Sequence, residues 1–153
     1  MRLVLDTNIL VRANAKAKGP ARQLLETIVG SREHTLLLSP FVLQELERVF
    51  SYERVQLSSK LTGEEVAQYL GYLRAKEVSE IVFPGPAPRV VPSGPDDDPV
   101  VQTAVAGHAD AICTLNRHFF HPDVISYCQE YGVLIANDVD LLALLRSGAH
   151  HGT

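Results

Sequence analysis

Cysteine, tryptophan, long apolar runs and an excess of positive charge are all scarce or absent in this sequence of 153 residues. The two cysteines, Cys113 and Cys128, lie in apolar segments without metal-site spacing, so we expect buried free thiols and a reducing cytoplasm. No apolar run is long enough to span a membrane, and the N-terminus lacks a signal-peptide pattern, so we expect no membrane contact. The net charge of −4 argues against a protein that binds nucleic acid mainly through a basic surface. It does not exclude an enzyme that reaches phosphates through metal ions, because bound cations reverse the local sign.

The chain contains short apolar runs that alternate with helical patterns. The runs predict buried strands over residues 3–6, 35–38, 111–115 and 133–136. Capping residues and apolar periodicity predict helices over residues 20–29, 40–50, from 62 onwards, 98–107, 122–131 and 138–146. We expect a Lys- and Arg-rich loop before the first helix, and a short extended piece at 89–91 in a proline-rich stretch.

This alternation predicts a parallel sheet with helices on both faces, which is a three-layer α/β/α sandwich. The length indicates one domain, which we expect to span residues 1–147. Residues 148–153 are expected to form a disordered C-terminal tail. In the last helix, Val139, Leu142 and Leu145 are expected to face inward.

Acidic residues accompany several of these elements. Asp6 ends the first strand, where an open α/β sheet places its ligands. Glu45 lies on the second helix, and the run Asp96-Asp97-Asp98 comes directly before a helix. Hard divalent ions such as Mg²⁺ or Mn²⁺ bind clustered carboxylates, and two-metal sites need several acids from separate elements. The pattern therefore predicts a divalent metal site.

Four motifs in register resemble a PIN domain over nearly the whole chain: Leu-Asp-Thr-Asn at 5–8, Glu-Leu at 45–46, Asp-Asp-Asp-Pro-Val at 96–100 and Ala-Asp-Ala-Ile-Cys-Thr-Leu-Asn at 109–116. The likeness is strongest to bacterial PIN proteins of toxin–antitoxin pairs, similar to VapC. The resemblance implies a metal-dependent endoribonuclease that acts on single-stranded RNA, with a five-stranded parallel sheet. It also implies a homodimer, and an antitoxin that covers the acidic cleft.

The resemblance also implies which residues of this chain bind the metal. Asp6 and Asp98 are implied as ligands, with Asp97 as the alternative to Asp98. The helical pattern leaves Glu45 and Glu47 equally placed at the edges of the apolar stripe, and the resemblance selects Glu45. Glu47 is then expected to form a solvated pair with Arg48.

Other residues of the motifs are expected to support this site. Thr7 offers a hydroxyl beside Asp6, Asn8 is expected to fix the turn, and Thr114 ends the fourth motif's strand. Asn116 stands where many PIN domains have an aspartate; its amide oxygen can approach a metal but carries no charge. A catalytic set of Asp6, Glu45, Asp98 and Asn116 therefore leaves the number of metal ions open.

Basic residues lie between the first strand and the first helix. Arg12, Lys16 and Lys18 could hold the RNA backbone near the metals, with Arg117 on the other side. An equally weighted alternative is that this loop only keeps the protein soluble.

Two other functions compete with the nuclease. A phosphatase that uses Asp6 as its nucleophile would need a second aspartate two positions later, where this chain has Asn8. A catalytically impaired PIN-fold module that binds RNA or protein is the second, and Asn116 is the residue that favours it.

Overall fold

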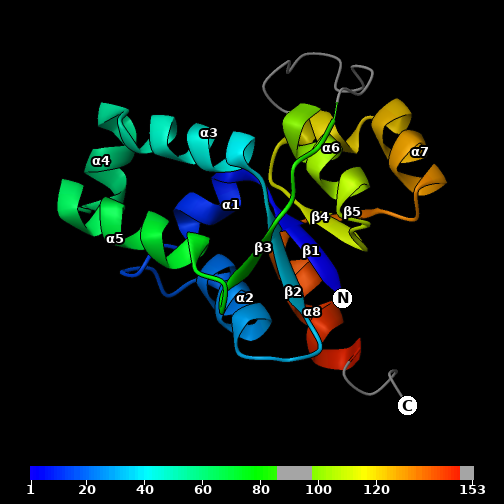
Figure 1. Ribbon diagram of the computed structural model, residues 1–153, viewed down its shortest axis with the longest axis horizontal. Coiled ribbons are helices and arrows are strands. Elements are labelled where there is room, and N and C mark those ends of the chain that lie inside the picture. Colours follow the sequence, from blue (N-terminus) through cyan, green and yellow to red (C-terminus); the bar gives the residue numbers. More distant parts are fainter. Residues whose placement is uncertain (86–97, 149–153) are drawn as a thin grey trace.

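The computed structural model describes residues 1–85 and 98–148, with only the backbone given for Asp98. Within these residues five strands form one sheet in the order β3-β2-β1-β4-β5. All four neighbouring pairs are parallel. The strands are β1 (Arg2–Leu5), β2 (Thr35–Leu38), β3 (Ser79–Ile81), β4 (Ala111–Cys113) and β5 (Leu134–Ala136). From β1, the chain adds β2 and β3 on one side and β4 and β5 on the other (Figure 1). The switch point of the sheet therefore lies at the end of β1.

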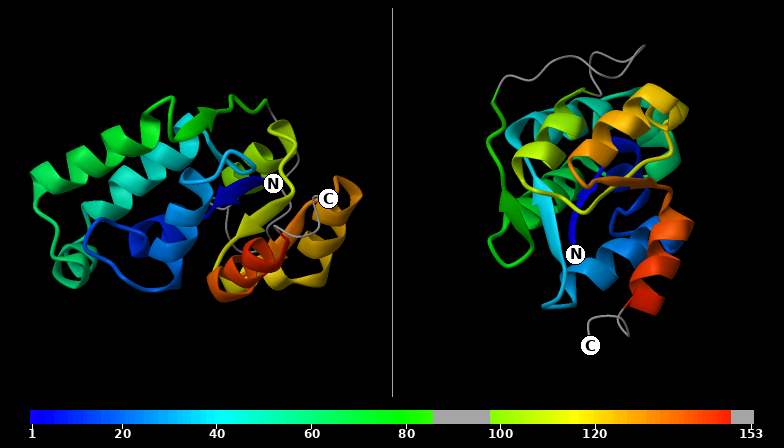
Figure 2. Two further views of the ribbon diagram at one scale, coloured as in Figure 1. Left: turned by 90° about the horizontal axis from the view of Figure 1, so that it is seen from below. Right: turned by 90° about the vertical axis from the view of Figure 1, so that its right-hand side faces the viewer.

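Helices cover both faces of the sheet. They are α1 (Thr7–Arg12), α2 (Pro20–Val29), α3 (Pro40–Phe50), α4 (Glu53–Ser59), α5 (Gly63–Arg74), α6 (Asp98–Ala106), α7 (Pro122–Glu130) and α8 (Asp138–Gly148), with a 3₁₀ turn at Arg117–Phe120. Helices α2 and α8 pack together on one face, and α6 and α7 lie on the other (Figure 2). The predicted three-layer α/β/α fold is confirmed.

Local sequence explains where several of these helices begin. The Ser39 hydroxyl accepts a hydrogen bond from the Val42 amide, and Pro40 occupies the first turn of α3. Thr62 and Glu65 form the predicted capping box at the start of α5. Gly30 follows the last residue of α2, as expected for a helix end.

Three short helices and strands, in addition to the 3₁₀ turn, were not predicted. The segment after Asp6, expected as a loop, forms α1, and α4 and β3 are also additional. Each is between three and seven residues long, which is too short for a clear periodic pattern. The extended piece expected at 89–91 lies outside the described residues, as do 149–153 of the expected tail.

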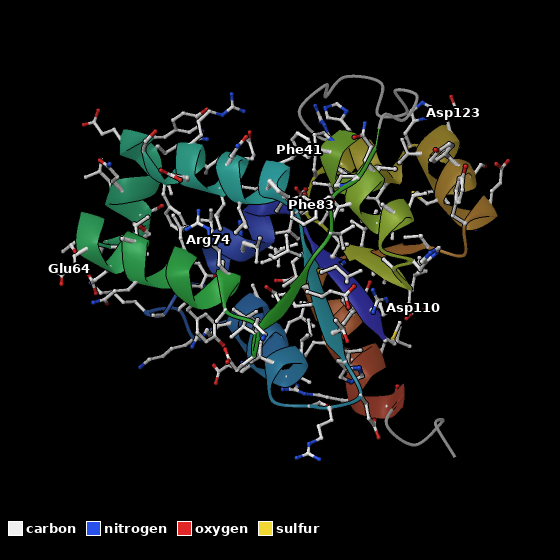
Figure 3. All side chains as sticks on the ribbon, viewed as in Figure 1. Phe41, Glu64, Arg74, Phe83, Asp110 and Asp123 are labelled. Carbon is white, nitrogen blue, oxygen red and sulfur yellow. The ribbon has the colours of Figure 1, made fainter. Side chains whose placement is uncertain are left out.

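The core lies between the sheet and the helices and is mainly aliphatic; the strands and the inner faces of α1, α2, α3 and α8 contribute most of it, and α5, α6 and α7 contribute the rest together with a few loop residues. Charged side chains such as Glu64 and Asp123 point away from it (Figure 3). Val139 was predicted to face inward but is exposed, and Leu141 is buried in its place. No helix in the described parts of the chain combines the length and the hydropathy needed to cross a membrane.

Both cysteines are buried and unpaired, as predicted. Burial raises the pKa of the Cys113 thiol above its ordinary value and raises the pKa of the Cys128 thiol to about 11. Neither thiol is therefore ionised at neutral pH, which keeps both chemically inert.

Candidate active site

The centre of the candidate site is formed by the ends of β1 and β4. Leu5 pairs with Cys113 in the parallel register, and the Asp6 amide extends the ladder by donating to the Cys113 carbonyl at 2.9 Å. The Thr114 amide likewise donates to the Ala136 carbonyl at 2.9 Å. Asp6 and Thr114 are therefore neighbours because of the register, although they lie 108 residues apart in sequence.

Asp6 is a buried carboxylic acid, with 4% of its surface exposed. Its Oδ1 accepts a hydrogen bond from the Thr7 amide at 2.8 Å, which caps α1, and its Oδ2 accepts one from the Thr114 hydroxyl at 2.7 Å. Burial raises the pKa of Asp6, the two hydrogen bonds oppose this, and the negative charge of Glu45 raises it further. Among the described residues, no Lys, Arg or His forms an ion pair with Asp6.

A hydrogen-bond chain connects Asp6 to the loop after β4. The Thr114 hydroxyl that donates to Asp6 also accepts from the Asn116 amide at 3.0 Å. The Asn116 Oδ1 accepts from the His118 amide at 3.0 Å, which begins the 3₁₀ turn. Asn8 Oδ1 accepts from the Leu115 amide at 3.4 Å. Asn8 was expected to fix its own turn through side-chain-to-backbone bonds, but the backbone amide that it bonds belongs to the loop after β4.

Glu45 is positioned by α3 so that its charge acts on Asp6. Its side chain is 27% exposed and forms an ion pair with Arg48, one turn later in α3. Glu47 is 66% exposed and lies 4.0 Å from Arg74 on α5. The expected Glu47–Arg48 pair is therefore wrong, because Arg48 lies three residues from Glu45 on the same helical face.

Asp97 and the side chain of Asp98 lie outside the described part of the structure. The backbone of α6 begins at Asp98, as predicted. Farther along α6, the buried Thr103 and Ser39 hydroxyls lie 2.8 Å apart, which fixes α6 beside the start of α3. Pro99 and Glu45 line the same surface cavity. The first turn of α6 is therefore close to Glu45.

The described side chains fit a hard divalent cation in chemistry, although they are not a complete metal site. Asp6 and Glu45 contribute only oxygen donors, and a nearby cation would compensate the charge that burial disfavours on Asp6. Within residues 1–85 and 99–148, no three His, Cys, Asp or Glu side chains are close enough to hold a metal. A site with three carboxylates at this edge therefore requires an acid from outside the described side chains, and the run Asp96-Asp97-Asp98 precedes α6.

The basic residues expected to bind RNA lie on different elements and differ in their contacts. Arg12 is exposed on α1, Lys18 is exposed before α2, and Arg117 is exposed in the 3₁₀ turn. Lys16 instead forms an ion pair with Glu65 at 3.1 Å and donates to the Lys60 carbonyl at 2.8 Å. Lys16 thus fastens its loop to α4 and α5.

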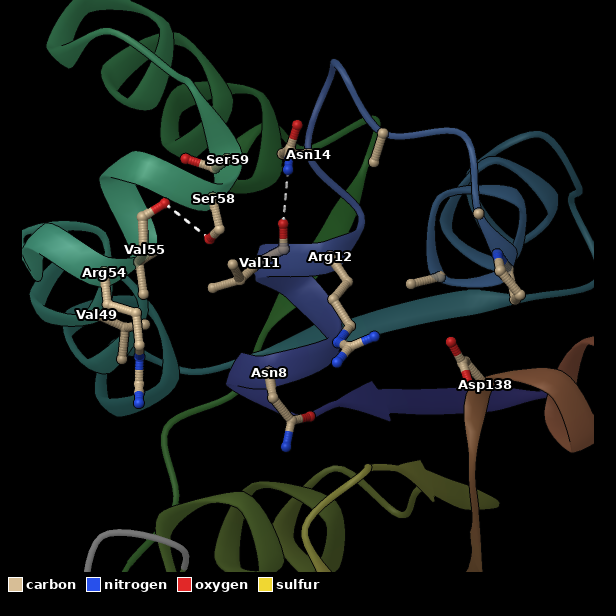
Figure 4. A pocket seen from close by; sticks show the side chains of 14 residues that line it. Asn8, Val11, Arg12, Asn14, Val49, Arg54, Val55, Ser58, Ser59 and Asp138 are labelled. Carbon is tan, nitrogen blue, oxygen red and sulfur yellow. Dashed lines mark hydrogen bonds between the residues drawn. The ribbon is translucent and has the colours of Figure 1, made fainter.

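A groove of about 580 Å³ runs beside α1 and connects Asn8 with Arg12 (Figure 4). Its opposite wall is provided by α4, which contributes Arg54, Ser58 and Ser59. Sequence reasoning did not single out Arg54, because α4 was not predicted and its position opposite α1 follows from tertiary packing. Asp138 also lines the groove and is buried at the start of α8, so it adds an acid near Arg12 that the sequence pattern did not reveal.

Comparison with known proteins identifies the same family that the sequence motifs resemble. A model of the PIN domain family matches residues 2–118. A chain in the crystal structure of VapBC2 from Rickettsia felis, bound to a DNA fragment from their promoter, has a similar fold with a TM-score of 0.57. It is 20% identical, and the match covers 90% of the present chain and 98% of that chain. No curated protein matches the chain.

Proposed function

This chain belongs to the PIN domain family, and on that premise we propose that it is a metal-dependent endoribonuclease that hydrolyses phosphodiester bonds of single-stranded RNA. PIN domains are generally nucleases, which supports a hydrolase. The observation that carries the proposal is Asp6: a buried carboxyl group at the switch point of the sheet, close to a second acid and without a cationic partner among the described residues.

The proposed metal ligands are Asp6, Glu45 and Asp98, with Asp97 as the alternative to Asp98. The chemistry that bound Mg²⁺ or Mn²⁺ supplies is activation of a water nucleophile and neutralisation of charge on the phosphate. Asn116 contributes an uncharged oxygen, which favours weaker binding of a second ion than an aspartate would give.

The remaining residues of the site position these ligands and the RNA. The Thr7 amide and the Thr114 hydroxyl fix the orientation of the Asp6 carboxyl group through one hydrogen bond to each oxygen. Arg12 and Arg54, on facing walls of the groove, are proposed to hold backbone phosphates on one side of the site, and Arg117 on the other. Lys18 extends the basic surface, whereas Lys16 is assigned a structural role by its contacts.

We further propose that the protein is the cytoplasmic toxin of a toxin–antitoxin pair and forms a homodimer. The similarity of its fold to a chain of the VapBC2 complex supports this assignment. The partner would be an antitoxin that covers the acidic edge of the sheet and offers it a cation, because an Arg side chain can form a bidentate pair with a carboxylate. A reading frame for a small DNA-binding protein beside the gene would support this pairing.

Cleavage of RNA tests the proposed activity. Wild-type protein is incubated with single-stranded and structured RNAs in Mg²⁺ or Mn²⁺, with and without a chelator, beside Asp6→Asn. We expect cleavage of single-stranded RNA that needs both the metal and Asp6. Cleavage that survives chelation or the substitution would contradict the metal mechanism.

One alternative outcome has a specific basis in the chain. If the protein binds Mn²⁺ and RNA but cleaves nothing, it is an impaired binding module, and Asn116 would be the residue responsible. Restoring the acid in an Asn116→Asp variant would then be expected to produce cleavage.

A further inference from the structure

A second cavity adjoins the proposed metal ligand Glu45. It measures about 280 Å³ and is lined by Phe41, Gln44, Glu45, Arg48 and Pro99. Glu45 therefore belongs to both the proposed metal site and this cavity. Anything that occupies the cavity lies directly beside the site where the phosphodiester bond would be cleaved.

Phe41 is the unusual member of this set, because 48% of its surface is exposed. It lies in the first turn of α3, while the buried face of that helix is formed by Val42, Leu43, Leu46 and Phe50. Phe41 is thus not part of the core, and Figure 3 shows it beside the start of α6. Single exposed apolar side chains are common on protein surfaces, but Phe41 differs from such residues because it lines a cavity together with Glu45.

The chemistry of the cavity matches a nucleobase. An aromatic face stacks on any base, and the guanidinium plane of an Arg can do the same. The Gln44 side chain offers both a donor and an acceptor to the edge of a base. The cavity is open to solvent and lined by both polar and apolar side chains, which suits a flat group that keeps part of its edge in water.

From this geometry we propose that the cavity holds one unpaired base of the RNA, stacked on Phe41, next to the cleaved phosphodiester bond. This proposal rests on the proposed endoribonuclease function and makes Phe41 and Gln44 determinants of which single-stranded sites are cut. Only an unpaired base can turn out of a strand and stack on a side chain, so the cavity also explains a requirement for single-stranded RNA.

The test compares three variants with the wild type. Phe41→Leu removes the aromatic face, Phe41→Tyr keeps it, and Tyr131→Leu removes an exposed aromatic residue that precedes β5 at the opposite edge of the sheet. Binding of a fluorescent single-stranded RNA is measured by anisotropy in EDTA, so that no cleavage occurs. We expect Phe41→Leu to weaken binding by about tenfold, while Phe41→Tyr and Tyr131→Leu stay close to the wild type.

A scan with abasic nucleotides then locates the contact. One abasic position near the cleaved bond should weaken binding to the wild type by about tenfold and have no effect on Phe41→Leu, because the two changes remove the same contact. A Phe41→Leu variant that folds, as checked by circular dichroism, and binds and cleaves RNA like the wild type would overturn the base site and leave the nuclease assignment intact. A wild-type protein that neither binds nor cleaves RNA would overturn both.

Discussion

At the scale of a single residue, two opposing effects act on the negative charge of Asp6. Burial disfavours its negative charge, while the Thr7 amide and the Thr114 hydroxyl favour it. The first effect is larger, so the pKa of Asp6 is raised in the folded protein. A buried carboxyl group gains more free energy from a bound cation than an exposed carboxyl group does, because the cation offsets the cost of burying the negative charge.

The pH dependence of stability follows from this raised pKa. In the unfolded chain Asp6 ionises at about pH 3.9. The metal-free wild type should therefore lose stability, relative to Asp6→Asn, as the pH rises from that value through the higher pKa of the folded state. Urea unfolding of both proteins in EDTA between about pH 4 and pH 8 measures the difference. A difference that is constant over this range would contradict the raised pKa.

Thr114 can be tested separately from the acid that it contacts. Thr114→Val removes the hydroxyl that donates to Asp6 and accepts from the Asn116 amide. We expect a loss of about 1–3 kcal/mol in the free energy of unfolding and at least about tenfold weaker Mn²⁺ binding. Thr114→Ser keeps the hydroxyl and should keep the affinity. Equal Mn²⁺ affinity of the two variants, by calorimetry, would show that the hydroxyl does not orient Asp6.

At the scale of elements, the longer helices and four of the strands could be predicted from periodicity, caps and apolar runs, although β5 was expected to be buried and instead lies at the edge of the sheet with Leu134 exposed. Ser39-Pro40 and Thr62 with Glu65 set helix starts through contacts within a few residues. The missed helix α1 follows Asp6, whose side chain caps it, and α1 has only six residues. Strand β3 has three residues with Glu80 at its centre, and it forms because β2 offers a free edge. Such short elements are decided by tertiary contacts.

The candidate site was also predictable only in part, because local sequence places some of its residues and tertiary contacts place the others. Asp6 could be placed at the edge of the sheet from its strand alone, whereas the helical pattern left Glu45 and Glu47 equally placed, and the two differ in exposure only in the folded chain. The Thr114 contact depends on the register of β1 with β4, and Arg54 and Asp138 reach the groove through helix packing. No pattern along the chain encodes these arrangements.

Substitution of two glycines by alanine tests how closely the end of α6 packs on the sheet. A Cβ atom at Gly107 would lie 2.9 Å from Leu37 Cδ1 and 3.1 Å from Val82 Cγ2, whereas Gly71 in α5 has no neighbour within 4 Å. Gly107→Ala should lower the free energy of unfolding by about 1–3 kcal/mol. Gly71→Ala should raise it by up to about 1 kcal/mol. Urea unfolding distinguishes the two, and equal effects would contradict the tight packing of α6.

At the scale of the whole molecule, a net charge of −4 means that RNA cannot be held by a general basic surface. Binding must come from local features: an acidic centre that takes cations, a groove with Arg12 and Arg54, and the cavity of Phe41. The parallel sheet makes this possible, because it brings the ends of β1, β2 and β4 to one edge.

The groove can be tested by the salt dependence of RNA binding. Arg12→Gln and Arg54→Gln should each weaken binding and reduce the slope of log K against log salt by about 0.7, the value for one phosphate contact in a single strand. Arg32→Gln serves as the control, because Arg32 is exposed and precedes β2, at the amino-terminal ends of the parallel strands. Anisotropy titrations in EDTA at several salt concentrations give the slopes. Equal slopes for all three variants would place the RNA backbone elsewhere.

The central claim is that acids distant in sequence converge into one cation site, and calorimetric titration with Mn²⁺ tests it most directly. Glu45→Gln and Glu47→Gln form a matched pair on α3, because only Glu45 acts on Asp6. We predict that Asp6→Asn abolishes Mn²⁺ binding, that Glu45→Gln weakens it by tenfold or more, on the order expected for loss of a metal contact, and that Glu47→Gln leaves it unchanged. Mn²⁺ binding that is the same in the wild type, Asp6→Asn and Glu45→Gln would contradict the account.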